Sequence, residues 1–284
     1  MYSHLDSREY TPPCIVEPMS AMPVSILLSR TVRLLIEPGA PVPSTGPNSF
    51  AASVSTPGLG AYFEVTIDCE GQPDEKTGFV ENIYEIDRSV CSILAPMLAE
   101  GLMPPAGNPA AIMKQAIEPI QEHLEARIHR LDCRLSPTYR IAMETNDMNS
   151  YLLTQQYQFA ASHRLHNPEL DESTNRALFG KCCNPNGHGH NYRMEVEVSL
   201  PIEGCGFTVQ DLDQVVHETI IDRYDHTYLN MDVDDFKTHN PTVENITVTC
   251  HDQLKPVLAE RGAKLRHIKL WETEKTCCTY PAQS

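Results

Sequence analysis

The sequence is poor in positive charge. Its 284 residues hold 22 Lys and Arg against 38 Asp and Glu, which gives a formal net charge of −16. Binding to nucleic acid or to an anionic membrane surface needs a basic face that neutralises phosphates. The composition therefore argues against nucleic-acid and membrane partners, but it leaves room for a small anionic substrate held by a few local cations.

Long apolar runs are also missing. The most apolar stretch, residues 89–113, contains four prolines and Glu100, which is not typical of a membrane-spanning helix. The first residues, MYSHLDSREYTPP, are polar and do not read as a signal peptide. With 41% hydrophobic residues, the composition predicts a globular, cytoplasmic protein of one large domain or two of ordinary size.

Cysteines are few, and their spacing does not suggest disulfides. Four of the ten form two adjacent pairs, Cys182–Cys183 and Cys277–Cys278, and neighbouring cysteines rarely bridge each other without strain. For a cytoplasmic protein we expect reduced thiols, most of which serve as small buried hydrophobes.

The two halves of the chain share three short segments in the same order. NGHGHNYRMEVEV (186–198) matches PGLGAYFEVTIDC (57–69) without a gap, NPTVEN (240–245) matches NPAAIM (108–113), and WETE (271–274) matches METN (143–146). Three ordered matches predict a duplicated unit. We expect an N-terminal extension at residues 1–24, a first unit at 25–148 and a second unit at 153–284.

Each unit is expected to run strand, strand, helix, helix, strand, strand. The periodicity predicts strands near 25–37, 60–70, 154–163, 189–200, 266–273 and 276–280, and helices near 210–223 and after Asn240–Pro241. The segment 139–145 is taken as the counterpart of the strand at 266–273, so Glu144 would correspond to Glu272. The Pro-, Gly- and Ser-rich segment 38–58 predicts an exposed loop, whereas its counterpart, 165–187, carries reactive side chains.

Three histidines lie on apolar rows of two predicted strands. Side chains alternate between the faces of a strand, so His188 and His190 share a face with the apolar residues Tyr192, Met194, Val196 and Val198. In the same way His163 shares a face with Tyr157, Phe159 and Ala161. If the two strands are antiparallel neighbours, the three imidazoles converge.

A metal ion would explain the three inward-facing imidazoles. Burying an imidazole without a partner costs about 1–3 kcal/mol, and three neutral histidines with one open position are typical of catalytic zinc. The alternative is that each imidazole hydrogen-bonds to the backbone. The first half has Leu59 and Ala61 where the second has His188 and His190, so it cannot build this site.

Candidate acid–base groups lie near the histidines in the sequence. Cys182 precedes His188 by six residues, and a nearby dication would lower the pKa of its thiol and favour the thiolate. Cys183 is the alternative candidate for this base. Asp225 beside His226 suggests a proton relay, although such a dipeptide is often structural. Glu272 either serves the site or supports the fold, since the first half retains Glu144.

The second half resembles the 6-pyruvoyltetrahydropterin synthase family, which includes the bacterial 6-carboxytetrahydropterin synthases. The matching segments are FAASHRL, LFGKCCNPNGHGHNY, DLDQVV, YDHTYLN, NPTVEN and LWETE, within residues 155–281. The resemblance implies an α+β tunnelling fold (T-fold), in which each β-β-α-α-β-β unit has an antiparallel sheet with two helices on one face. It also implies a homo-oligomer of units around a barrel, with active sites between units.

The resemblance further implies the substrate, 7,8-dihydroneopterin triphosphate, and the roles of individual residues. His163, His188 and His190 correspond to the ligands of Zn²⁺, Cys182 to the catalytic base, and Asp225 with His226 to its relay partner. Glu272 corresponds to the anchor of the pterin's guanidine-like edge, and Thr242 and Glu244 lie in a segment near the pterin. Candidate phosphate partners are Arg164, Lys181 and Arg193.

Several alternatives stay open at this point. The spacing C-x5-HGH resembles the pyruvoyl-forming enzymes, whereas the carboxy-forming ones, which release acetaldehyde, more often show C-x3-HGH; residue 184 is Asn. A non-catalytic pterin-binding protein would not need Cys182, Asp225 and His226. A zinc hydrolase would be expected to show an H-E-x-x-H helix. The fused, degenerate first unit departs from the single-unit family pattern and would halve the number of active sites.

Overall fold

The computed structural model describes residues 25–37, 59–104, 107–204 and 206–282. The predicted N-terminal extension at 1–24 and the predicted loop at 38–58 lie outside the described residues. The eight cysteines within the described ranges are free thiols. No helix in these ranges is long and apolar enough to cross a lipid bilayer.

The described part of the first half contains four strands and two helical stretches in the predicted order, and the first stretch is made of α1, a π-helical segment and α2. Its elements are β1 (Ile26–Ile36), β2 (Ala61–Gly71), α1 (Ile83–Ser89), a π-helical segment (Val90–Leu94), α2 (Ala95–Gly101), α3 (Pro109–Gln121), β3 (Arg127–Arg134) and β4 (Tyr139–Glu144).

The second half repeats this order with additions. Its elements are β5 (Ser150–His163), α4 (Glu172–Phe179), a 3₁₀ turn (Gly180–Cys183), β6 (His188–Pro201), α5 (Val209–Val216), a π-helical segment (His217–Ile221), α6 (Asp222–Tyr224), β7 (Thr227–Tyr228), α7 (Leu229–Asp232), a 3₁₀ turn (Asp234–Phe236), α8 (Val243–Glu260), β8 (Lys264–Thr273) and β9 (Thr276–Tyr280). The segment 165–187 is therefore not wholly a loop, because α4 lies within it.

The described strands form one nine-stranded sheet in the order β1-β2-β3-β4-β5-β6-β8-β9, with β7 pairing with β5. All neighbours along the main path are antiparallel, and only β7 runs parallel to its partner. The halves meet where β4 pairs with β5, from Tyr139 opposite Gln155 to Ala142 opposite Leu152. Since β5 begins at Ser150, the connection between the halves is a short turn.

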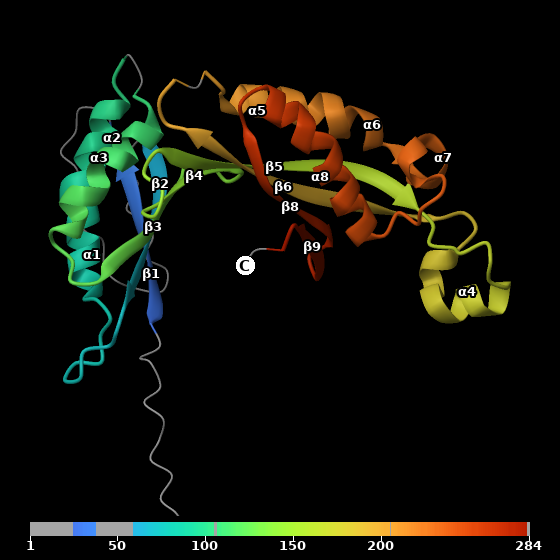
Figure 1. Ribbon diagram of the computed structural model, residues 1–284, viewed down its shortest axis with the longest axis horizontal. Helices are drawn as coiled ribbons and strands as arrows, with labels where there is room; N and C mark the ends of the chain where they lie inside the picture. The colour runs from blue at the N-terminus through green and yellow to red at the C-terminus, as the bar shows by residue number, and fades with distance from the viewer. Residues whose placement is uncertain (1–24, 38–58, 105–106, 205, 283–284) are drawn as a thin grey trace, which may run out of the picture.

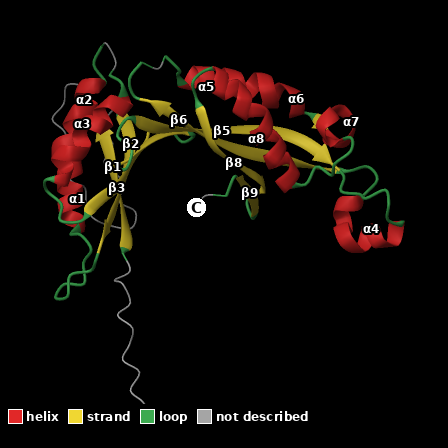
Figure 2. Ribbon diagram, in the orientation of Figure 1, coloured by secondary structure: helices red, strands yellow, loops and turns green. Residues whose placement is uncertain are grey.

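Helices cover one face of the arched sheet. Figures 1 and 2 show α1, α2 and α3 over the first four strands and α5, α6 and α8 over the others, all on the outer side of the arch. Alternate residues of β2, namely Phe63, Val65, Ile67 and Cys69, are buried against the first group. Residues of β6, among them Tyr192, Met194, Val196 and Val198, enter a separate core under the second. The two halves thus have separate cores beneath one sheet.

Local sequence explains where the helices of the second half begin. Thr242 is the N-cap of α8, where its hydroxyl accepts from the Asn245 amide at 3.3 Å. The helix was predicted to begin after Asn240–Pro241, and it begins at Val243. Thr208 and Asp211 form a capping box at the start of α5. The predicted helix at 210–223 is confirmed, although a π-helical segment interrupts it.

The assumed correspondence of Glu144 with Glu272 is wrong. Glu144 ends β4, the fourth strand of the first half, whereas Glu272 lies on β8, which is the third strand of the second half in sheet order. The match of METN with WETE aligned the second strand of one hairpin with the first strand of the other. A match of four residues is too short to distinguish the two strands of a hairpin. Glu144 instead pairs with Arg130, with 3.3 Å between Oε1 and Nη1.

Both halves contain the same irregularities. The pairing of β2 with β3 shifts register between Asp68 and Cys69, and the pairing of β6 with β8 shifts between Glu197 and Val198. The gapless match of the two halves aligns these two bulges with each other. A π-helical segment also interrupts the helical stretch that follows the second strand of each half. Bulges and π-segments are specific local features, so their recurrence favours a repeated unit.

Candidate functional site

Three imidazoles meet at one end of the sheet. In the antiparallel pairing of β5 with β6, His163 lies opposite His188 and Ala161 lies opposite His190. This register directs the three side chains to the helix-covered face. One nitrogen from each ring lies within 4.8 Å of the others, and the Nε2 atoms of His163 and His188 are 3.1 Å apart. The convergence expected from the apolar rows is present, and the metal role of the cluster stays a prediction.

His163 is the most buried of the three. Its Nδ1 lies 2.6 Å from the carbonyl oxygen of Pro241, so this nitrogen is the donor and Nε2 presents its lone pair to the cluster. The pKa of His163 is lowered to about 4, mainly by burial; the Pro241 carbonyl opposes the shift, and the neighbouring His188 and His190 add to it. A neutral imidazole is the form that binds a metal ion.

Glu272 completes the cluster from the neighbouring strand β8. Its Oε1 lies 3.6 Å from Nε2 of His163 and 3.8 Å from Nε2 of His190. Nε2 of His190 and Nδ1 of His188 are buried without a hydrogen-bond partner. Burial lowers the pKa of His190, and Glu272 opposes that shift. A buried unpaired ring nitrogen is costly, so Nε2 of His190, next to the other two imidazoles, points to a ligand that would satisfy it.

The two adjacent cysteines have different surroundings. Cys183 is buried, and its thiol donates to the carbonyl of Gly180 at 3.1 Å. Cys182 is half-buried. Burial raises the pKa of the nearby Tyr192 hydroxyl, and the charges of Glu272 and Cys182 raise it further. Burial raises the pKa of Cys182, and Glu272 and Cys183 raise it further. The lowering expected from the sequence would therefore have to come from a bound cation.

Asp225 and His226 form a pair at the edge of β5. One oxygen of Asp225 accepts from the Ala160 amide at 2.7 Å and the other lies 2.7 Å from Nδ1 of His226. These contacts, led by the Ala160 amide, lower the pKa of Asp225. The His226 side chain is 83% exposed and its backbone has φ of 58°.

A cavity of about 590 Å³ includes His226 together with His190. Gly189 and Asn191 of β6 and Ala160, Ala161 and Ser162 of β5 also line it. Within the described ranges, no hydrogen bond, ion pair or ring contact joins His226 to the three imidazoles or to Cys182. The structure therefore places the pair beside the cluster but not in contact with it.

Thr242 and Glu244 flank the cluster at the start of α8. The preceding residue, Pro241, supplies the carbonyl that holds His163. The Thr242 hydroxyl caps the helix, which already accounts for that side chain, and Glu244 is exposed on the first turn. Their roles toward a pterin stay predictions.

The three candidate phosphate partners lie in different parts of the second half. Arg193 alternates with Tyr192 and Met194 and so lies on the opposite face of β6, where its guanidinium is 4.3 Å from the Trp271 ring. Arg164 donates from Nε to the Cys183 carbonyl at 3.0 Å and supports the loop that carries the cysteines. Lys181 is exposed on that loop. Arg193 is therefore not near the imidazoles.

Sequence reasoning missed three contributors to the site. The Pro241 carbonyl gives no signal in a sequence. Tyr192 was read as part of the apolar row, yet its hydroxyl lies 3.4 Å from Nδ1 of His163. Gly187 has φ of 68°, and a Cβ there would lie 2.9 Å from the His163 carbonyl and 2.9 Å from the Tyr228 ring. The glycine before the first histidine of the HGH motif was the only available hint.

Comparisons with known proteins cover the same half of the chain. The family model described as 6-pyruvoyl tetrahydropterin synthase matches residues 152–283. The 6-pyruvoyl tetrahydrobiopterin synthase of Pongo abelii is 38% identical over 134 residues, which cover 46% of this chain and 91% of that protein. The one of Drosophila melanogaster is 37% identical over 131 residues, covering 45% and 77%. The structure of Caenorhabditis elegans 6-pyruvoyl tetrahydropterin synthase is 32% identical and covers 47% of this chain and 96% of that one, with a TM-score of 0.43.

Replacing Gly187 tests how tightly the cysteine loop is held against β5. We expect Gly187→Ala to lower the free energy of unfolding by about 2–4 kcal/mol, because the added methyl group meets backbone at a left-handed φ. Gly204→Ala is the matched control: its φ is 74°, but a Cβ there meets nothing within 4 Å, so only the backbone strain of about 1–2 kcal/mol applies. Urea unfolding of the two variants measures the difference, and equal losses would contradict the close approach.

Proposed function

We propose, from the premise that the chain belongs to the 6-pyruvoyl tetrahydropterin synthase family, that its second half converts 7,8-dihydroneopterin triphosphate with loss of triphosphate. The observation that carries the proposal is the cluster of His163, His188, His190 and Glu272, with Cys182 beside it, inside the region that matches the family. The chain covers 91% of the length of the Pongo abelii relative, so most of such a unit is present.

We propose that the cluster binds Zn²⁺ through the three imidazoles. Two nitrogens on one tetrahedral zinc ion at ordinary bond lengths are roughly 3.3 Å apart, close to the 3.1 Å between Nε2 of His163 and Nε2 of His188. The unpartnered Nε2 of His190 supplies the third ligand. When bound, the ion would hold the side-chain hydroxyls of the substrate and acidify the adjoining bonds.

The remaining residues would move protons and orient the substrate. Cys182 would act as the base, because it is the less buried cysteine of the pair and its thiol, unlike that of Cys183, does not donate to the Gly180 carbonyl. His226 would exchange a second proton across the cavity that it shares with His190, with Asp225 holding its Nδ1. The Glu272 carboxylate would accept from the guanidine-like edge of the pterin and so fix the ring beside the metal. Thr242 and Glu244 would contribute to the pocket wall.

The product is 6-pyruvoyltetrahydropterin in this proposal. The C-x5-HGH spacing and the Pongo abelii and Drosophila melanogaster relatives favour it over 6-carboxytetrahydropterin, whose formation releases acetaldehyde. A non-catalytic pterin-binding role is less favoured because Cys182, Asp225 and His226 are all present near the imidazoles.

We further propose that residues 25–148 and 153–284 are two versions of one T-fold unit, of which the first lacks the metal ligands. The repeated element order, the aligned bulges and the two π-helical segments support this division. Leu59 and Ala61 occupy the positions of His188 and His190 in the alignment, so one chain would have one active site.

The free edges of the sheet favour a homo-oligomer. β1 and β9 end the strand order, and each has one side that no described strand covers. Ile26, Leu27 and Tyr280 expose apolar side chains on these edges. Exposed edge strands are templates for further pairing, so we propose that chains associate edge to edge, with active sites between T-fold units.

Removing one imidazole tests the metal site. We expect the full-length protein to retain about one zinc ion per chain after dialysis, and His190→Ala to weaken binding at least tenfold because a ligand is lost. His217→Ala removes an exposed histidine that faces Asp222 and should leave metal content unchanged. Elemental analysis and competition with a chromophoric chelator give both values. Unchanged affinity in His190→Ala would refute the ligand assignment.

Replacing each cysteine in turn tests the base. Cys182→Ala should lower turnover of 7,8-dihydroneopterin triphosphate by about 10²–10⁴-fold, the usual contribution of a general base, with zinc content intact. Cys183→Ala should keep most of the activity, because its thiol points to the Gly180 carbonyl. Product analysis by chromatography, with an assay for acetaldehyde, reads out the reaction. Loss of activity in Cys183→Ala alone would reverse the assignment.

The assembly can be measured directly. Light scattering should give the full-length protein a mass that is a multiple of 31.8 kDa. A lysine at an apolar edge position blocks strand pairing, so Leu27→Lys should shift the mass toward one chain. Leu178→Lys changes an equally exposed leucine on α4, away from both edges, and should have no such effect. A monomeric wild-type protein would exclude edge pairing.

A further inference from the structure

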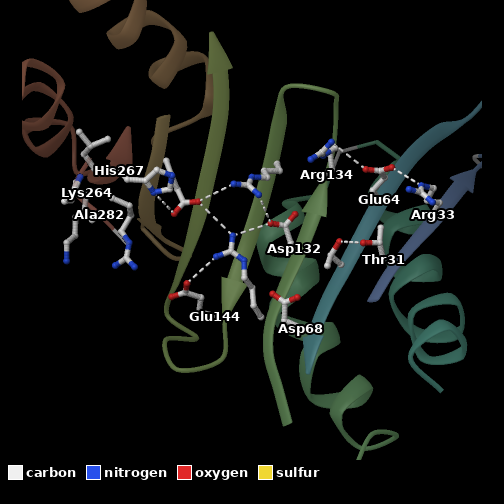
Figure 3. A pocket seen from close by; sticks show the side chains of 17 residues that line it. Thr31, Arg33, Glu64, Asp68, Asp132, Arg134, Glu144, Lys264, His267 and Ala282 are labelled. Atoms are coloured by element: carbon white, nitrogen blue, oxygen red, sulfur yellow. Dashed lines mark hydrogen bonds and ion pairs between the residues drawn. The ribbon is translucent and has the colours of Figure 1, made fainter. Parts of the chain in front are cut away.

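Charged side chains from both halves meet on the face of the sheet that the helices leave open. They line a cavity of about 830 Å³ around the junction of β4 with β5, as Figure 3 shows. This cavity is separate from the imidazole cluster, which lies on the helix-covered face. Four carboxylates and three basic side chains form a network of ion pairs here: Asp132, Glu144, Glu195, Glu197, Arg130, Arg140 and His267. All of them except Glu195 line the cavity.

Two of these carboxylates are buried in the second half. Glu195 and Glu197 on β6 are only 8% and 4% exposed. Glu195 accepts from the Gln156 amide at 2.9 Å and from Arg140 at 3.3 Å, and Glu197 accepts from the Thr154 hydroxyl at 3.1 Å. Ionised carboxylates are costly to bury unless cations compensate them, so the source of that positive charge matters.

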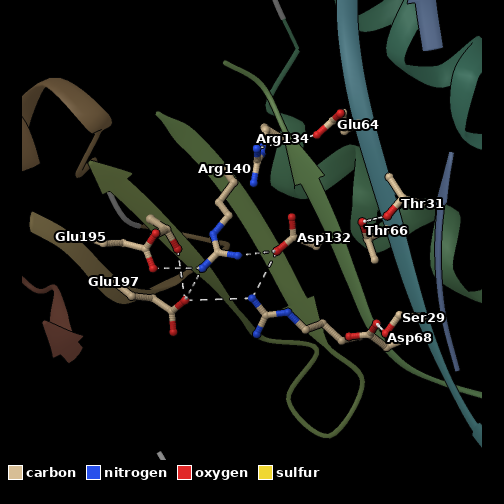
Figure 4. Close-up of polar contacts among 12 residues, drawn as sticks. Ser29, Thr31, Glu64, Thr66, Asp68, Asp132, Arg134, Arg140, Glu195 and Glu197 are labelled. Carbon is tan, nitrogen blue, oxygen red and sulfur yellow. Dashed lines mark hydrogen bonds and ion pairs between the residues drawn. The ribbon is translucent and has the colours of Figure 1, made fainter. Parts of the chain in front are cut away.

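Both guanidinium groups come from the first half. Arg140 on β4 lies 3.3 Å from Glu195 and 3.9 Å from Glu197, and Arg130 on β3 lies 4.0 Å from Glu197 (Figure 4). Asp132 bridges the two arginines, at 3.3 Å from Arg130 and 3.7 Å from Arg140. The first half therefore holds these arginines in place and presents them across the junction.

The second half contributes to the same compensation through His267 and Gln156. His267 on β8 lies 3.9 Å from Glu195 and 3.5 Å from Glu197 but is charged only when protonated. Lys269 is the cross-strand neighbour of Glu195, with its ammonium 4.7 Å from the centre of the Trp271 ring. Burial raises the pKa of Glu195, yet hydrogen bonds from His267 and Gln156 and the charge of Arg140 outweigh it and lower the pKa to about 2. Glu195 is thus ionised in the folded chain.

The matching positions of the first half show no such network. Thr66 and Asp68 on β2 align with Glu195 and Glu197, and they hydrogen-bond to Thr31 and Ser29 of the edge strand β1 at 2.8 and 2.5 Å (Figure 4). The buried carboxylate pair is therefore a feature of the junction and not of the repeated unit.

We propose that the first half, which lacks the imidazoles, is the intramolecular partner of the second: through Arg130 and Arg140 it supplies the positive charge that Glu195 and Glu197 need inside the sheet. β6, which carries this carboxylate pair, also carries His188 and His190. The half with the candidate metal site thus depends on the half without it. This role does not require the first half to bind any ligand.

A double-mutant cycle in the full-length chain tests the proposal. Arg140→Met keeps most of the unbranched stem and removes the charged guanidinium, and we expect the midpoint of thermal unfolding at pH 8 to fall by about 5 °C or more. Glu195→Gln added to Arg140→Met should recover at least half of that fall, because the uncompensated charge is gone. If Arg140→Met alone does not fold, folding of the double variant gives the same answer.

The pH dependence separates this role from simple packing. Without Arg140 the pKa of the buried carboxylates rises in the folded state, so the penalty is present at high pH and is relieved as protons bind. The difference in unfolding midpoint between wild type and Arg140→Met should therefore shrink between pH 8 and pH 5. Arg134→Met, which loses a half-exposed arginine 3.7 Å from Glu64 within the first half, should shift the midpoint by less than about 2 °C at both pH values.

Two results would overturn the proposal. One is a double variant no more stable than Arg140→Met, which would mean that the arginine does not act through Glu195. The other is a deficit that stays constant from pH 8 to pH 5, which would assign the loss to packing of the arginine stem.

Discussion

The candidate site depends on the register between β5 and β6. Because His163 lies opposite His188 and Ala161 opposite His190, the imidazoles enter one face together with Phe159 and Tyr192, whose rings stack with centroids 4.9 Å apart. A slip of one residue would move every side chain of the strand to the other face, and the histidines would then lie among the charged residues of the open face. The apolar residues of the same rows resist such a slip, since they fill the core beneath α5 and α8. The register between β5 and β6 therefore determines both the packing of the core and the geometry of the site.

Burial within this register also determines the chemical state of the site. It keeps His163 neutral, and the Pro241 carbonyl assigns the proton to Nδ1, so Nε2 is free to act as a ligand. The same burial raises the pKa of the Cys182 thiol, which opposes the thiolate that a base requires. A metal ion at the imidazoles would resolve this conflict, because it uses the neutral nitrogens and its charge stabilises a thiolate. One bound cation would thus suit both the neutral form of His163, which burial favours, and the thiolate of Cys182, which burial opposes.

Patterns confined to one strand could be read from the sequence, and patterns that depend on the order of strands could not. The alternation of His188, His190 and Tyr192 with polar residues indicated their shared face, and the beginnings of the strands were within a few residues. The assignment of Glu144 to Glu272 failed because it required knowing which strand of a hairpin pairs with β6. Arg193 could have been placed on the far face by parity alone. The Pro241 carbonyl could not have been found, since a backbone atom acts there regardless of its side chain.

Charged side chains of both signs gather on the open face of the sheet, although the chain as a whole has a net charge of −16. At the junction of β4 with β5, four carboxylates surround two arginines and one histidine, so only two side chains of this network carry a permanent positive charge. Such an arrangement is stable only while both arginines remain in place, because losing one leaves buried carboxylates without a counter-charge. The arginines come from different strands than the imidazoles: Arg130 and Arg140 project from β3 and β4, whereas the three imidazoles project from β5 and β6. The first half therefore stabilises the second through the charges that it presents across the junction, although it does not supply the imidazoles.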